Sequence, residues 1–403
     1  ELEKFLKVES ERFGELTLRL FHTELEAVYE EFNRSQDNDG RLVYYKLMET
    51  LFPKSHYGTQ TTIGTSEHLK NPSMVAIHNY FDKYYVANNM AVMLIGDFDF
   101  DTAVPMIDKY FGSYAAKPAP TQYVAKEEPV KTIVTSEVFS PSSERVQFAY
   151  RFDGAKSSDA KYVTLIDYIL SNSTAGLIDL NINQQQKALG AGSGASFFRD
   201  YGMHSFSGAP KQGQSLEEVR DLMLAQLENI KQGKFEDWMI EAVVNDLKKS
   251  RLQSWNDSRS LAASLYKSYI NDMPWAQVVD QYDDMGRVTK QELMDFAKKN
   301  YTNNYVIVYK RLGENKDLVR VSNPGITPIQ LNRGAESQFY KDFMKIESKE
   351  IAPVFVDFKK EMNEGKVKSA KFTSIDNKTN DLSSVYYISD MGSDHNKKLG
   401  LAI

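Results

Sequence analysis

The sequence contains no cysteine. This absence excludes a disulfide framework, a zinc site built on thiolates and a cysteine nucleophile. It does not indicate a compartment, because cysteine-free proteins occur on both sides of a membrane. No apolar run approaches the about 20 residues that a membrane-spanning helix needs. The formal net charge is −6, with no dense Lys/Arg stripe. We therefore expect neither a membrane span nor a nucleic-acid partner.

The signals that mark the ends of a complete chain are also missing. The sequence starts at Glu1 without an initiator methionine or a signal-peptide pattern, and it stops in apolar residues at Ile403 without a helix cap. We interpret the chain as an internal fragment of a longer protein. Two common catalytic or binding motifs are absent as well. Gly190–Gly194 lacks the Lys-Ser/Thr that completes a phosphate loop, and no Gly-x-Ser-x-Gly elbow occurs.

What is present is typical of a folded, multidomain protein. The chain has 403 residues, of which 41% are hydrophobic and 12% aromatic. That length exceeds one hydrophobic core of ordinary size, so two or three domains are expected.

Hydrophobic periodicity predicts an α+β fold. Helices are expected over 1–34, 42–51, 72–84, 160–170, 216–231 and 236–255, and strands over 90–95, 130–138, 145–152, 190–208 and 305–310. In the helix after Pro72, the residues Met74, Ile77, Phe81 and Tyr84 form an apolar stripe that predicts burial.

The order of elements suggests an internal duplication. A helix followed by a strand occurs at Pro72–Ile95 and again at Thr289–Tyr309. The composition of Lys117–Pro120 indicates a linker between the two copies. Asp381–Asp390 reads as a strand that opens a third unit.

The densest group of ionisable residues lies on the first predicted helix. Glu24 and Glu31 are seven residues apart, which is nearly two helical turns, so both carboxylates lie on one face. Glutamates on an amphipathic helix usually form a solvated surface. These two are predicted to lie near the apolar stripe of Val28 and Phe32, and a carboxylate near a core needs a partner such as a metal or an arginine.

Several short sequence motifs in the first 114 residues resemble those of the insulinase/pitrilysin (M16) family of zinc metallopeptidases. The family pattern is a Glu-rich helix, an H-x-Y-G loop followed by I-G, a helix ending in Y-Y-x-P-N-N-M, and a strand ending in G-D. The matching words here are Glu24–Glu31, His56–Gly58, Ile63–Gly64, Tyr84–Met90 and Gly96–Asp97, with Ala87 where the family commonly has proline. The resemblance continues to about Arg311 with fewer matching words.

This resemblance implies a fold and a metal. Family members are built from repeated LuxS/metallohydrolase-like domains, each a mixed or antiparallel sheet with helices packed on one face, which close into a clam-like chamber. Their zinc is held by an inverted His-x-x-Glu-His motif and a downstream glutamate. By position, Glu31 corresponds to that third protein ligand of Zn²⁺, and Glu24 to a carboxylate beside the site that tunes it.

The rest of the family's catalytic machinery is not in the sequence. None of the six histidines has a partner four residues later, so His-x-x-Glu-His is absent. His204 and His395 read as loop or strand-end residues, and His22, His56, His68 and His78 as ordinary surface or packing residues. An Arg and a Tyr that contact substrate in the family are replaced by Gln184 and Ala191.

The resemblance divides the chain into four parts. Residues 1–116 are expected to form the C-terminal part of a first M16 domain, 122–315 a second domain, 316–352 a linker, and 353–403 the start of a truncated third domain. The parent is expected to be a zinc-dependent endopeptidase of peptides or unfolded polypeptides, which such enzymes often bind by adding a strand to an exposed sheet edge. Its remaining halves would be partners of this fragment, which alone is expected to be inactive. The alternative is a non-catalytic paralogue that holds substrates or partners.

Overall fold

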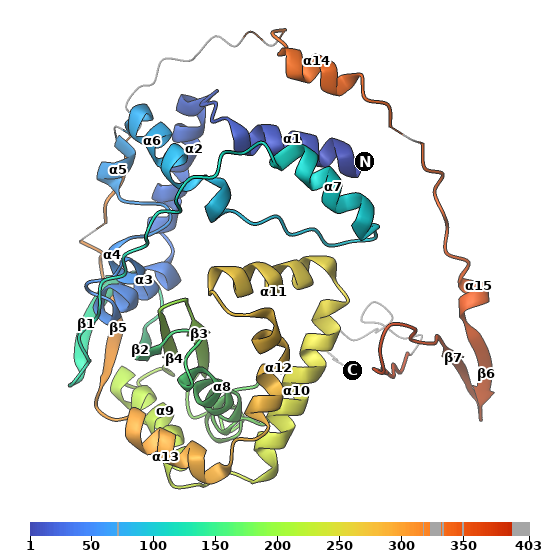
Figure 1. Ribbon diagram of the computed structural model, residues 1–403. Helices are drawn as coiled ribbons and strands as arrows, with labels where there is room; N and C mark the ends of the chain where they lie inside the picture. Colours follow the sequence, from blue (N-terminus) through green and yellow to red (C-terminus); the bar gives the residue numbers. More distant parts are fainter. Residues whose placement is uncertain (71, 317, 323–331, 333, 349, 389–403) are drawn as a thin grey trace, which may run out of the picture.

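A five-stranded mixed sheet forms the centre of the fold (Figure 1). The computed structural model describes residues 1–70, 72–316, 318–322, 332, 334–348 and 350–388. The strands are β1 (Val134–Ser140), β2 (Arg145–Asp153), β3 (Gly190–Phe197), β4 (Tyr201–Ala209) and β5 (Tyr305–Leu312), in the order β1-β5-β2-β4-β3. The pair β1–β5 is parallel and the other pairs are antiparallel. The predicted α+β class is confirmed.

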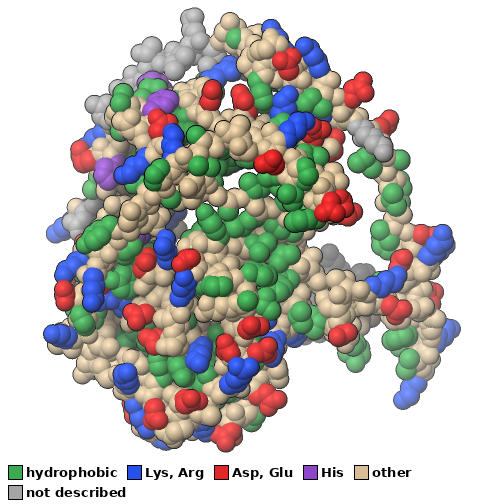
Figure 2. Space-filling model, in the orientation of Figure 1, with side chains coloured by type: hydrophobic (Ala, Val, Ile, Leu, Met, Phe, Trp, Pro, Cys, Tyr) green, Lys and Arg blue, Asp and Glu red, His purple; other side chains and the backbone are tan. Residues whose placement is uncertain are grey.

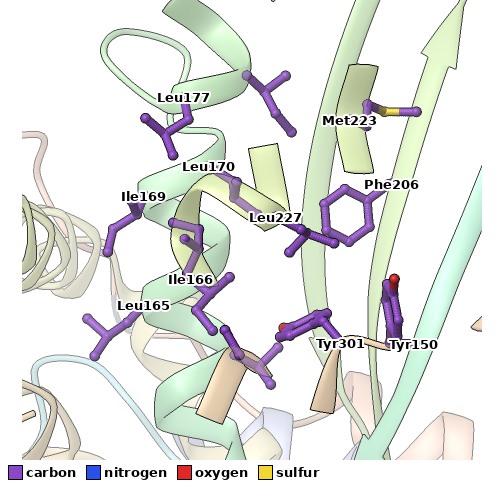
Figure 3. Close-up of a cluster of buried hydrophobic side chains, with 14 of the residues drawn as sticks. Tyr150, Leu165, Ile166, Ile169, Leu170, Leu177, Phe206, Met223, Leu227 and Tyr301 are labelled. Atoms are coloured by element: carbon purple, nitrogen blue, oxygen red, sulfur yellow. The ribbon is translucent and has the colours of Figure 1, made fainter. Parts of the chain in front are cut away.

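One face of this sheet is covered by helices from the same part of the chain. They are α8 (Asp159–Leu170), α9 (Leu216–Lys231), α10 (Trp238–Trp255) and α13 (Lys290–Asn300). Figure 3 shows Ile166 and Leu170 of α8 pointing toward Leu227 of α9 and Phe206 of β4. The predicted periodicities located these elements because each one buries a continuous apolar face.

Two further helices extend α10 away from the sheet. They are α11 (Ser258–Ile270) and α12 (Trp275–Met285), and the rings of Trp255 and Trp275 stack with centroids 5.4 Å apart. Tyr266, Tyr269 and Ile270 of α11 are about half exposed. Figure 2 shows hydrophobic side chains gathered over α10 and α11.

The other face of the sheet is covered by a helix from the first part of the chain, α3 (Asp39–Leu51). Its Val43, Leu47 and Leu51 are fully buried against residues that include Val306 and Val308 of β5. Burying a side chain of this size stabilises the fold by about 2 kcal/mol, so α3 is firmly attached to the sheet.

The remaining elements of residues 1–116 are helical. They are α1 (Leu2–Gly14), α2 (Phe21–Gln36), α4 (His56–Thr59), α5 (Ser66–Lys70), α6 (Met74–Tyr84), η1 (Ala87–Asn89) and α7 (Phe100–Phe111). The helix predicted over 1–34 is interrupted between α1 and α2, where Leu20 adopts a left-handed conformation with φ of 64°.

Two predictions for this region are wrong. Met90–Ile95 is not a strand, because an extended segment becomes a strand only beside a hydrogen-bonding neighbour, and the described residues place none there. Consequently the stripe on α6 is not a buried face: no residue of α6 is buried, and Met74 is 41% exposed. The first copy of the predicted duplication therefore reproduces the helix of the second copy but not its strand.

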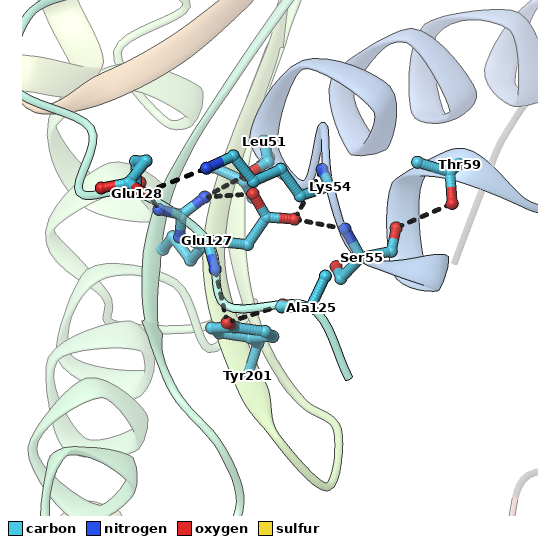
Figure 4. Close-up of polar contacts among 9 residues, drawn as sticks. Leu51, Lys54, Ser55, Thr59, Ala125, Glu127, Glu128 and Tyr201 are labelled. Atoms are coloured by element: carbon cyan, nitrogen blue, oxygen red, sulfur yellow. Dashed lines mark hydrogen bonds and ion pairs between the residues drawn. The ribbon is translucent and has the colours of Figure 1, made fainter. Parts of the chain in front are cut away.

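A buried carboxylate joins the segment that leads into β1 to the loop that follows α3 (Figure 4). Glu127 Oε1 accepts hydrogen bonds from the backbone N–H groups of Lys54 and Ser55, at 2.9 and 2.7 Å. Its other oxygen lies 3.8 Å from Arg151 Nη1, and both side chains are almost fully buried. The backbone N–H of Glu127 donates to the hydroxyl of Tyr201 on β4.

The C-terminal part carries small, exposed elements: α14 (Gln338–Met344), α15 (Phe358–Glu361) and the antiparallel hairpin of β6 (Asn363–Val367) and β7 (Ala370–Ser374). The strand predicted over 381–390 is not formed over 381–388, and its last two residues lie outside the described residues. Tyr387 is 98% exposed, so nothing in the described structure covers this apolar segment. Among the described residues, no helix is long and apolar enough to span a bilayer.

Candidate metal-ligand helix

The helix α2 carries both glutamates that the sequence singles out. Glu24 lies in its first turn, where a negative charge interacts favourably with the helix dipole. Its backbone N–H donates to Leu20 O at 3.0 Å, which closes the first turn. Glu31 follows two turns later on the same face, as the spacing predicts.

The opposite face of α2 is anchored to the rest of the protein. Tyr29 and Phe32 are 2% and 5% exposed and pack with Leu69 and Val321. The Tyr29 hydroxyl donates to Leu69 O at 2.8 Å, and burial raises its pKa. At 100° per residue, Tyr29 lies about 160° from Glu31 around the helix axis. Anchoring one face therefore sets the direction of the other.

Both glutamates are exposed. This corrects the expectation that Glu24 and Glu31 lie close to the core, because the apolar contacts of α2 turn both carboxylates away from it. No hydrogen bond or ion pair holds either side chain within the part of the chain that the structure describes. Their predicted roles at a zinc site therefore rest on their position on the helix and not on contacts.

The described residues alone do not form a metal site. A zinc site with an open position needs three protein ligands, and no group of three His, Cys, Asp or Glu side chains that could hold a metal occurs among them. His22 is exposed, and the ring of His56 contacts that of Tyr57 in a tilted arrangement with centroids 4.4 Å apart. His68 and His78 are exposed, and His395 lies outside the described residues. Glu31 could therefore supply one ligand, and the donor set present does not complete a site.

The sequence analysis predicted that His204 lies in a loop or at the end of a strand, and this prediction is wrong. It lies in the middle of β4, is fully buried, and its ring hydrogen-bonds Tyr301 Oη at 2.7 Å and Asp167 Oδ1 at 3.1 Å. Asp167 also accepts hydrogen bonds from Ser193 Oγ at 2.6 Å and Ala195 N at 2.9 Å. A lone histidine gives no sign of these bonds, since its own partners come from α8 and the end of α13 and the further partners of Asp167 come from β3.

Side chains also bond the backbone of β3 along the outer edge of the sheet. β3 is an edge strand that pairs only with β4. Its Ala191 is bonded on the free side by Asn183, which accepts from Ala191 N and donates to Ala191 O, both at 2.9 Å. Asn183 ends a π-helical turn, η2 (Asp179–Asn183). The backbone of β3 is thus occupied at Ala191 and Ala195, where an added strand would otherwise bond.

Comparisons with known proteins agree with this fold. The family model described as "Peptidase M16 inactive domain" matches residues 75–247. The zinc protease PqqE of Helicobacter pylori is 23% identical over 281 residues, which are 67% of this chain and 62% of the relative. The chain therefore spans less than two thirds of this curated relative.

Solved structures show the same architecture. The crystal structure of a protease from Helicobacter pylori matches with a TM-score of 0.71 and 20% identity, covering 77% of both chains. The periplasmic protease PqqL from Escherichia coli matches with a TM-score of 0.64 and 16% identity, covering 88% of this chain and 40% of PqqL. These likenesses confirm the predicted domain fold.

Proposed function

We propose, from the premise that the chain belongs to the M16 peptidase family, that it is part of a zinc-dependent endopeptidase acting on peptides or unfolded polypeptides. Similarity to peptidases of this family is the starting point. What we propose is that the metal is zinc, that cleavage is internal to the substrate chain, and that the substrates are peptides or unfolded polypeptides. Support for the metal comes from the relative named a zinc protease. Support for a longer parent comes from PqqL, of which this chain matches 40%.

The observation that carries the proposal is the two-faced character of α2. The side of the helix that carries Tyr29 is buried, with Phe32 beside it, and the side that carries Glu24 and Glu31 is exposed. An exposed but directionally fixed carboxylate is suited to complete a metal site whose other ligands come from another segment. Glu31 would be that ligand, and Glu24 would adjust its surroundings.

Zinc in such a site supplies Lewis-acid chemistry to the scissile peptide bond. The other ligands and the group that activates water would come from a His-x-x-Glu-His motif, which this sequence lacks. The contribution of this chain is therefore limited to one ligand, its supporting helix and the walls of a substrate chamber formed with the remaining parts of the parent.

The test compares the parent protein with its Glu31→Gln variant in zinc content and in cleavage of a quenched peptide. We expect about one zinc per parent chain, and loss of both zinc and cleavage in the variant, because the amide is a poor zinc ligand. The 403-residue chain alone should show neither. Metal-dependent cleavage by the chain alone, or unchanged zinc binding after the substitution, would contradict the proposal.

A second candidate is a non-catalytic M16 protein that holds substrates or partners. It is favoured by the matching family model, which describes an inactive domain. A parent that binds no zinc and is indifferent to Glu31→Gln would support this reading.

A further inference from the structure

We infer that Asn33, clamped to Val321, is a positioning residue that sets the direction in which α2 presents Glu31. This inference rests on the proposed role of Glu31 and concerns how that side chain is held. It arises from contacts between residues that are 288 positions apart in the chain.

The polar half of the clamp uses both groups of one side-chain amide. Asn33 Nδ2 donates to Val321 O, and Asn33 Oδ1 accepts from Val321 N, each at 2.8 Å. An amide that satisfies the N–H and the C=O of the same residue acts as a neighbouring strand would, and it accepts only one orientation of that backbone. The segment 318–322 is therefore fixed against α2 in register as well as in distance.

The apolar half of the clamp uses the side chain of the same residue. Val321 is 3% exposed and packs in the cluster with Tyr29, Phe32 and Leu69. Arg320 also forms an ion pair with Asp37 at 2.5 Å, but both side chains are about half exposed. Exposed pairs contribute little, so we assign the holding contacts to Asn33 and Val321.

The clamp lies opposite the glutamates. Asn33 follows Glu31 by two residues, which places it about 200° around the helix from Glu31 and about 40° from Tyr29. A helix held at this one stripe has little freedom to rotate about its axis. Glu24 and Glu31 thus point in a direction determined by a segment that comes after β5, the last strand of the sheet.

This arrangement gives the segment 318–322 a role beyond that of a connection. A metal ligand must be held within about 0.5 Å of its productive position, and loss of groups that support ligands lowers metal affinity by about 10-fold to 100-fold. The clamp provides such support without touching the glutamate itself.

The experiment uses the full-length parent protein and two variants, Asn33→Ala and Val321→Ala. Alanine is the better helix former, so Asn33→Ala does not weaken α2 locally. Val321→Ala removes the apolar half of the clamp from the distant segment. The readouts are hydrogen exchange of peptides covering 318–322 and zinc affinity measured by competition with a chelator.

We expect both variants to accelerate exchange over 318–322 by about tenfold, as loss of a hydrogen bond or of buried packing predicts. We also expect the zinc Kd to rise about tenfold. Arg320→Ala is the matched control in the same segment. It removes the exposed ion pair and should change both readouts by less than about twofold.

The outcomes separate the clamp from the proposed function. Unchanged hydrogen exchange over 318–322 in both variants would show that Asn33 and Val321 do not hold this segment on α2. Accelerated exchange with an unchanged zinc Kd would overturn the positioning role. A wild-type parent that binds no zinc overturns the proposed function itself and, with it, this role. Faster exchange together with weaker zinc binding in both variants supports the inference.

Discussion

At the scale of single residues, Asp167 is a buried carboxylate bonded to residues of β3 and β4. Burial raises its pKa, but the hydrogen bond and charge of His204, together with the bonds from Ser193 and Ala195, outweigh this effect and hold the pKa below its ordinary value. The folded protein therefore keeps Asp167 ionised at a pH where the unfolded chain binds a proton. The resulting stability is complete above about pH 4, the ordinary value for aspartate, and is lost as the pH falls through the folded pKa.

The variant Asp167→Asn tests this. Because hydrogen bonds to a charged group contribute about 2 kcal/mol, we expect the variant to be less stable than the wild type by about that amount at pH 7. The difference should shrink as the pH falls below about 4. Urea unfolding between pH 3 and 7 measures it. Asp283→Asn, which breaks an exposed pair with Lys248, is the control, and parallel curves for the wild type and Asp167→Asn would refute the linkage.

At the scale of elements, the edge of the sheet at β3 is closed by side chains. An exposed strand edge offers unpaired N–H and C=O groups to any extended chain. Here Asn183 occupies both groups of Ala191, and Asp167 occupies Ala195 N. If the parent binds substrates by strand addition, β3 is a poor place for it between these two residues.

We expect Asn183→Ala to open this edge. The loss of the two hydrogen bonds to Ala191 should lower the free energy of unfolding by about 2 kcal/mol, and the unpaired strand should promote self-association. Light scattering and thermal unfolding at increasing protein concentration would detect both effects. Asn181→Ala is the matched control from the same turn, since the Asn181 side chain donates to Gln226 Oε1 on α9 and not to β3 among the described residues. Equal self-association of the two variants would show that Asn183 does not prevent association through the edge of β3.

At the scale of the whole molecule, the two parts of the chain joined by residues 117–120 are bound together by polar and aromatic contacts as well as by α3. Glu127 ties the segment before β1 to the loop after α3. In α4, directly after this loop, Tyr57 donates to Asp200 Oδ2 at 2.8 Å and stacks on Phe198, with centroids 4.9 Å apart. Burial and the bond to Asp200 raise the pKa of Tyr57 to about 12, so this bond persists at physiological pH.

A glycine in α4 allows this short helix to pack closely against the end of α3. A Cβ on Gly58 would lie 2.3 Å from Phe52 O and 2.4 Å from Met48 O. The His56–Gly58 word that resembles the M16 family therefore has a structural reason here: tyrosine makes the contact between the two parts, and only glycine fits beside it.

Replacing Glu127 tests the joint. Glu127→Ala leaves the buried Arg151 without its charge partner and two backbone N–H groups without an acceptor, so we expect a loss of about 3 kcal/mol in the free energy of unfolding. The adjacent Glu128→Ala is the control, since Glu128 forms an exposed pair with Lys54 that contributes little. Urea unfolding compares the two variants. Similar destabilisation by both would mean that the buried carboxylate does not hold the parts together.

The sequence by itself determined most elements of the sheet domain, the family resemblance and the spacing of Glu24 and Glu31. It read 190–208 as one strand where the structure has β3 and β4, and it did not predict α11 and α12. The features that it determined depend on periods of two or about 3.6 residues, which are written into neighbouring positions. The helix α9 (Leu216–Lys231) was predicted with its observed bounds because its apolar face and its Ser215 capping box are local signals.

Only the tertiary structure decided what depends on distant partners. Met90–Ile95 has the composition of a strand but no neighbouring strand among the described residues, and His204 acquires its bonds from α8 and from the residue that ends α13. The direction of Glu24 and Glu31 likewise follows from the contact between Asn33 and Val321, which no local pattern records. A repeating pattern can place residues on one face of a helix, but the packing of the whole chain determines what that face meets.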